Sequence, residues 1–225
     1  MRWFLVTCAI VLAGCGVDAP ALPDGLALQA RQLVGMPSPR PAELPEFSLY
    51  GDGTVIRPGP AAGALQTAET VHIGHERSVD FYEDAHDAGL DRDQDIRNDS
   101  VIDGYTQVFV LNSGGHRFVT RAANPEGELA AFHSTLHVDG TATPYRPTKI
   151  AAVAWAHSSS QDARPWPFAA PETKVDAGTC VVLDAAQVEG FARDVAKGTR
   201  FRVGASSFIV VFRPLLPGES GCGDV

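Results

Sequence analysis

The sequence lacks an apolar run long enough to cross a membrane as a helix, which takes about 20 residues. Trp3–Leu12, the uncharged segment near its start, has only ten residues. Lysine is also scarce, with 3 lysines beside 15 arginines, and the net charge is -9. An acidic chain is poorly suited to non-specific contact with nucleic acid or anionic lipid headgroups. We therefore expect no nucleic-acid partner.

Cysteine is equally sparse, with four in 225 residues. Cys8 lies inside the apolar segment and Cys15 follows it closely. The other two, Cys180 and Cys222, are an even pair, which favours a structural disulfide in an oxidising compartment. The sequence has no Cys-x-x-Cys motif, the spacing that would indicate redox catalysis. Two free thiols are the alternative to the disulfide.

The N-terminus has the features of a signal peptide, with one basic residue, Arg2, before an apolar segment of h-region length. The run Leu12-Ala13-Gly14-Cys15 resembles the lipobox of bacterial lipoproteins. This resemblance implies that residues 1–14 are removed. It also implies that Cys15 carries a diacylglyceryl group and palmitate. Two acyl chains anchor a protein stably, so we expect it on the extracytoplasmic face of the cell membrane. Cleavage as an ordinary secretory signal is the alternative.

Residues 15–45 follow as a proline-rich segment with little periodic hydrophobicity, which predicts a lipidated N-terminus and an extended tether. A short helix over 26–33 is the alternative. The remaining residues, 46–225, have an ordinary globular composition and a length suited to one domain. We expect two halves in this domain, of about 46–123 and 145–222.

The hydrophobic pattern predicts strands grouped around one helix in each half. In the first half, strands are expected at 47–50, 54–56, 65–73, 106–111 and 116–120, with a helix from Glu76 to Gly89. In the second half, strands are expected at 150–156, 180–183, 201–203 and 207–213, with a helix from Asp184 to Gly198. Asp184 and Gln187 have capping-box spacing.

These elements predict an α+β fold with one antiparallel sheet, built from two loosely similar β-β-α-β-β units. Each unit packs one helix on the sheet. The segments Leu44–Ile56 and Arg213–Glu219, with Cys222, are similar to actinobacterial lipoproteins of uncharacterised function. The resemblance spans most of the mature chain and implies an envelope location and this fold. It carries over no catalytic residue, because no reaction or ligand is established for that family.

We assign no metal site, although two patterns suggest one. The first consists of three histidines with helix-compatible spacing, His72, His75 and His86. The second is the segment with Asp91, Asp93 and Asp95, whose spacing is that of the first carboxylates of a calcium-binding loop. Ile96 and Ile102 stand where an EF-hand needs glycine and glutamate. Surface histidines and a solvated acidic loop are the alternatives, and we expect no cofactor.

No catalytic residue can be singled out. There is no Gly-x-Ser-x-Gly elbow. Trp155, Trp166 and Phe168 are candidates for an aromatic ligand groove, with a core-capping role as the alternative. We therefore expect a non-enzymatic binding or protein-interaction module at the cell envelope, held by its lipid and contacting an envelope protein partner. The alternatives are an envelope-associated hydrolase and an accessory ligand-binding subunit of a transporter or sensor.

Overall fold

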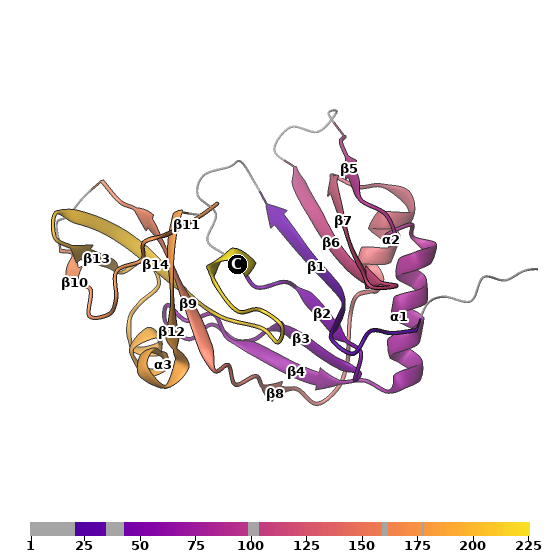
Figure 1. The fold of residues 1–225 in the computed structure, drawn as a ribbon, viewed down its shortest axis with the longest axis horizontal. Helices are drawn as coiled ribbons and strands as arrows, with labels where there is room; N and C mark the ends of the chain where they lie inside the picture. The colour runs from indigo at the N-terminus through magenta and orange to yellow at the C-terminus, as the bar shows by residue number, and fades with distance from the viewer. Residues whose placement is uncertain (1–20, 35–42, 99–103, 159–161, 177) are drawn as a thin grey trace, which may run out of the picture.

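The computed structural model describes residues 21–34, 43–98, 104–158, 162–176 and 178–225. Within these ranges the chain forms two β-sheets and three α-helices. The sheets lie side by side, with α1 (His75–Asp87) and α2 (Gly127–Thr135) beside the first and α3 (Ala185–Asp194) beside the second (Figure 1). The α+β class is confirmed. The single antiparallel sheet is wrong, since the strands divide between two sheets.

The first sheet, which we call sheet A, has eight strands in the order β5-β7-β6-β1-β2-β3-β4-β8. Their bounds are β1 Leu26–Val34, β2 Phe47–Tyr50, β3 Thr54–Pro58, β4 Ala68–His72, β5 Gln94–Ile96, β6 Tyr105–Ser113, β7 His116–Ala123 and β8 Thr143–Pro144. Neighbours are antiparallel except for the parallel pair β5 and β7. β1 therefore lies in the interior of the sheet, between β2 and β6.

β1 occupies part of the segment that we expected to be a tether. A register shift between Leu26 and Leu28 places both Ala27 and Leu28 in the core beneath the helices. This bulge breaks the alternation of apolar and polar residues that marks a strand in a sequence. The expected tether is therefore wrong for Leu26–Val34, and so is the alternative helix over 26–33, because these residues form a strand. Cys15 and the predicted signal peptide lie outside the described residues.

The second sheet, sheet B, has six strands in the order β10-β13-β14-β9-β12-β11. Their bounds are β9 Lys149–Ala156, β10 Arg164–Pro165, β11 Thr173–Val175, β12 Gly178–Asp184, β13 Arg200–Val203 and β14 Ser206–Pro214. The four strands predicted for this half correspond to β9, β12, β13 and β14. The two short strands β10 and β11 complete the edges, and β10 runs parallel to β13.

The expected repeat of two similar units fails at the level of strand order. In sheet A, the hairpin β6–β7 joins the sheet through its first strand, β6, which pairs with β1. In sheet B, the hairpin β13–β14 joins through its second strand, β14, which pairs with β9. Sheet A also carries two helices rather than one. The two halves thus share the types of their elements but not their arrangement.

The helices are stabilised mainly by burial of one face. α1 buries Phe81 and Tyr82 against sheet A and ends before Gly89, whose φ of +75° suits glycine. α3 begins after Asp184 as predicted, but the Asp184 side chain makes no capping hydrogen bond. Its carboxylate accepts a bond from Lys149 Nζ at 2.8 Å instead. Among the described residues, no helix is long and apolar enough to span a membrane.

The core of sheet B is aromatic. Trp166 is 8% exposed, and its indole N–H donates to the carbonyl of Ala169. Five phenylalanine rings surround it at centroid distances of 5.2–6.5 Å: Phe168, Phe191, Phe201, Phe208 and Phe212. Trp166 is therefore a core residue and not the lining of an aromatic groove.

The C-terminal tail, residues 215–225, returns from β14 and packs between the two sheets (Figure 1). Leu216 joins an apolar cluster on the face of sheet A opposite the helices, with Leu44, Tyr50, Ile56 and Ala68. Cys222, in the short 3-10 helix η1 (Cys222–Asp224), forms the predicted disulfide with Cys180 of β12. The tail thus covers the β2–β4 half of that face and leaves the β1, β6 and β7 half uncovered by this cluster.

Candidate functional site

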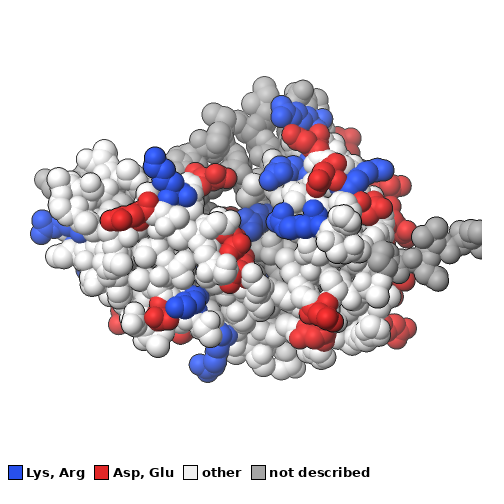
Figure 2. Space-filling model, in the orientation of Figure 1, with Lys and Arg blue, Asp and Glu red and all other residues white. Residues whose placement is uncertain are grey.

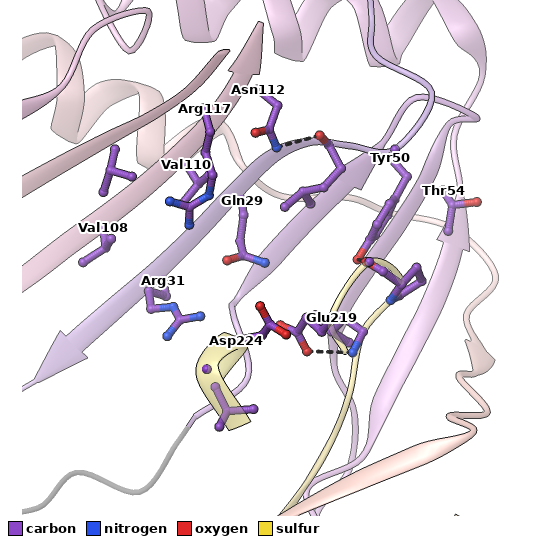
Figure 3. Close-up of a pocket in the computed structure, with 18 of the residues that line it drawn as sticks. Gln29, Arg31, Tyr50, Thr54, Val108, Val110, Asn112, Arg117, Glu219 and Asp224 are labelled. Atoms are coloured by element: carbon purple, nitrogen blue, oxygen red, sulfur yellow. Dashed lines mark hydrogen bonds between the residues drawn. The ribbon is translucent and has the colours of Figure 1, made fainter. Parts of the chain in front are cut away.

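A cavity of about 910 Å³ lies between the tail and the face of sheet A that the helices leave free (Figure 3). Its volume is within the range of small-molecule pockets. One side consists of β1, β6 and β7. The other side consists of the tail, the turn that follows β11, the β2–β3 hairpin and residues 24–25. The cavity is therefore built from segments that are far apart in the sequence.

Alternation along three strands produces the floor of this cavity. Side chains at every second position point into it: Gln29, Arg31 and Leu33 from β1, Val108 and Val110 from β6, and Arg117, Val119 and Arg121 from β7. In the register, Arg31 pairs with Val108, and Val108 pairs with Arg121. Two strand spacings thus separate the Cα atoms of Arg31 and Arg121, roughly 10 Å.

The three arginines of the floor form no hydrogen bond or ion pair within the part of the chain that the structure describes. Arg31 is half-buried on β1, while Arg117 and Arg121 are exposed on β7. Burial, together with the positive charges of Arg213 and Arg117, lowers the pKa of the Arg31 guanidinium, and Glu219 opposes this effect. An arginine remains charged in proteins, so Arg31 keeps a positive charge that the fold does not pair.

Acidic side chains line the opposite side, and three of them are engaged within the fold. Glu219 pairs with Arg213, and Asp52 accepts the backbone N–H of Thr54 at 2.9 Å. Asp224 accepts the backbone N–H groups of Ser220 and Gly221, which lowers its pKa. Asp24 and Asp176 complete the acidic lining. Basic and acidic side chains accordingly gather next to each other on this face (Figure 2).

Neutral polar residues hold the walls in place. Tyr50 donates its hydroxyl proton to the carbonyl of Pro217 in the tail at 3.3 Å, and burial raises the pKa of this tyrosine. Asn112 donates to the carbonyl of Leu26 at 2.8 Å (Figure 3). Gln29 donates to Ser48 Oγ at 3.3 Å. The cavity is therefore braced by its own strands and by the tail.

The histidine candidates do not come together. His72 is exposed at the end of β4, and His75 is the first residue of α1. His86 lies in the last turn of α1, where its Nε2 is 3.1 Å from Ser113 Oγ and its ring packs edge-on against Tyr82. Among the described residues, no group of three or more His, Cys, Asp or Glu side chains is arranged to hold a metal ion.

The aspartate candidates belong to the edge of sheet A. Asp93 accepts the backbone N–H of Val119 at 2.8 Å. Asp95 lies within β5 and pairs with Arg97 at 3.4 Å, while Asp91 is exposed after α1. The expected acidic loop is thus partly a strand, β5, which pairs with β7, and of the three carboxylates only that of Asp93 bonds to β7 among the described residues.

Sequence reasoning missed the arginine floor, although one of its signals was visible. Arg117 lies within a predicted strand and Arg121 directly follows it. Arg31, in contrast, lies in β1, which was not recognised as a strand, so its place beside β6 could not be inferred.

Comparison of the chain with protein-family models, with curated proteins and with solved structures finds no match.

Proposed function

We propose that this protein is a membrane-anchored extracytoplasmic lipoprotein that serves as a non-enzymatic binding module. The lipobox-like run that ends at Cys15 supports the anchor. The Cys180–Cys222 disulfide suits an oxidising compartment. The cavity beside the tail is the binding site in this proposal, and its ligand is an anion.

The observation that supports an anionic ligand is the set of arginines on the cavity floor without partners in the described chain. A guanidinium group recognises carboxylate and phosphate through parallel N–H···O bonds. Most acidic groups of the cavity already accept hydrogen bonds from the fold, whereas Arg31, Arg117 and Arg121 donate to no acceptor among the described residues. An incoming anion would therefore satisfy donors that are otherwise left to water.

The test measures thermal stabilisation of the full-length protein by acetate, butanoate or phosphate against sodium chloride at the same ionic strength. A ligand that binds the native state raises the unfolding temperature. We expect stabilisation of the wild type by at least one of the three anions, and its loss in the double variant Arg31→Gln/Arg117→Gln.

Arg202→Gln is the matched control, because Arg202 is an exposed strand arginine of sheet B outside the cavity. Its response should equal that of the wild type. An equal response in the cavity variant, or no stabilisation by any of the anions, would overturn the proposal.

A further inference from the structure

The arginines of the cavity floor surround an apolar strip. Val108 lies in the register between Arg31 and Arg121, and Val110 lies between Gln29 and Val119. Val108 and Val119 are partly exposed toward the cavity, as is Leu33 of β1. The positive charges thus stand at the margins of an apolar strip on the cavity floor.

A small hydrated anion would not use this strip. When phosphate or acetate binds a guanidinium group, the neighbouring valines stay in water. An anion with an apolar body removes the valine side chains from water at the same time, which contributes favourably in proportion to the area buried. Ligand sites commonly combine an apolar lining with a few polar groups that fix orientation.

The acidic side of the cavity restricts the charge of the ligand. Glu219 and Asp224 of the tail face the strands from across the cavity (Figure 3), and Asp176 adds a third carboxylate from the turn after β11. A second negative group on the ligand would approach these carboxylates and be repelled. A ligand with one anionic group and an uncharged remainder meets no such repulsion.

We infer that the cavity takes a monoanionic organic acid with an apolar body, its carboxylate on the arginines and its body across Val108 and Val119. This inference rests on the proposed anion site and defines the class of ligand for it. The roughly 10 Å between the Arg31 and Arg121 Cα atoms leaves room for an aryl group or a short alkyl chain over Val108.

In the experiment, the full-length protein is titrated separately with acetate, butanoate, hexanoate and adipate. Calorimetry measures the affinity for each carboxylate. Transfer of one methylene group out of water corresponds to about a fourfold gain in affinity. We expect affinity to rise about fourfold per methylene from acetate to hexanoate. Adipate, in which a second carboxylate replaces the terminal methyl group of hexanoate, should bind more weakly than hexanoate.

Two near-isosteric variants assign the effect to the strip. Val108→Thr should flatten the dependence of affinity on chain length. Val203→Thr, at a 40% exposed valine of sheet B outside the cavity, should behave like the wild type. Circular dichroism confirms that each variant is folded.

The outcomes separate the two proposals. Equal affinities for acetate, butanoate and hexanoate, with loss of binding in Arg31→Gln/Arg117→Gln, would overturn the organic-acid inference and leave the anion site standing. Tighter binding of adipate than of hexanoate would do the same. The absence of binding for every carboxylate and for phosphate would overturn both.

Discussion

Arg213 of β14 and Glu219 of the tail form a bidentate ion pair that holds the tail against sheet B. Arg213 is fully buried on β14, and its Nη1 and Nη2 atoms lie 2.7 and 2.8 Å from the two carboxylate oxygens of Glu219. Oε2 of Glu219 also accepts the backbone N–H of Leu216 at 2.7 Å. The pair therefore fixes the segment that carries Leu216 into the apolar cluster of sheet A, and so sets one wall of the cavity.

Replacement of this carboxylate should be costly. Glu219→Gln leaves the buried Arg213 charge uncompensated, and removal of one partner from a buried pair typically costs 3–5 kcal/mol. We expect the free energy of unfolding, measured with urea, to fall by about 3 kcal/mol. Asp184→Asn is the control, because its pair with Lys149 is exposed and should contribute less than about 1 kcal/mol. Equal losses in the two variants would contradict this role of the pair.

The elements that sequence reasoning found are those whose signals are local. α3 has an apolar stripe over one face, although it ends at Asp194 and not at the predicted Gly198. β9 and β12 are short apolar runs, and the hairpin β2–β3 surrounds a glycine turn. Each of these patterns is contained within about a dozen residues, so no knowledge of a partner segment was needed to identify it.

Most of the elements that it missed depend on distant segments, although the helix α2 was missed as well. β1 carries a bulge and gains its stability from β2 and β6 on either side. β10 and β11 have only two and three residues, too few to show alternation. The strand order of each sheet and the return of the tail are set by long-range pairing. The cavity lies where these features meet, and for this reason its arginines could not be grouped from the sequence.

The disulfide should contribute strongly to stability. Cys180 and Cys222 are 42 residues apart in the chain, and the chain-entropy model assigns about 4 kcal/mol to a loop of this size. Cys180→Ser/Cys222→Ser should lower the free energy of unfolding by about 2–4 kcal/mol, the range typical of disulfides. Denaturation with and without a reductant measures this loss. The double variant, which has no bond to reduce, should not respond to the reductant.

Mass spectrometry provides an independent check of the same bond. Reduction should add two hydrogens to the intact protein. A mass that stays constant on reduction would show that the two thiols are free in solution.

The lipid anchor is testable at Cys15. Cys15→Ala should move the protein from the membrane fraction to the soluble fraction, because the diacylglyceryl group would have no attachment site. Cys8→Ala, inside the apolar segment, is the matched control and should leave the protein in the membrane fraction. Retention of the Cys15→Ala protein in the membrane after loss of residues 1–14 would contradict the single-anchor proposal.

The local stability of the tail should fall in acid, because Asp224 becomes protonated. Hydrogen bonds from Ser220 and Gly221 lower the pKa of this carboxyl group in the folded protein. Its contribution is therefore present above the unfolded value, about 3.9, and is lost as the pH falls through the folded pKa. Asp224→Asn should cost at most about 1 kcal/mol at pH 7, since the group is exposed, and the difference from wild type should vanish in strong acid. Hydrogen exchange at the Ser220 and Gly221 amides measures this local effect.

The control is Asp176→Asn, which removes a cavity carboxylate without a hydrogen-bonding partner in the described chain. It should leave these amides protected at pH 7, and the same loss of protection in both variants would contradict the role of Asp224.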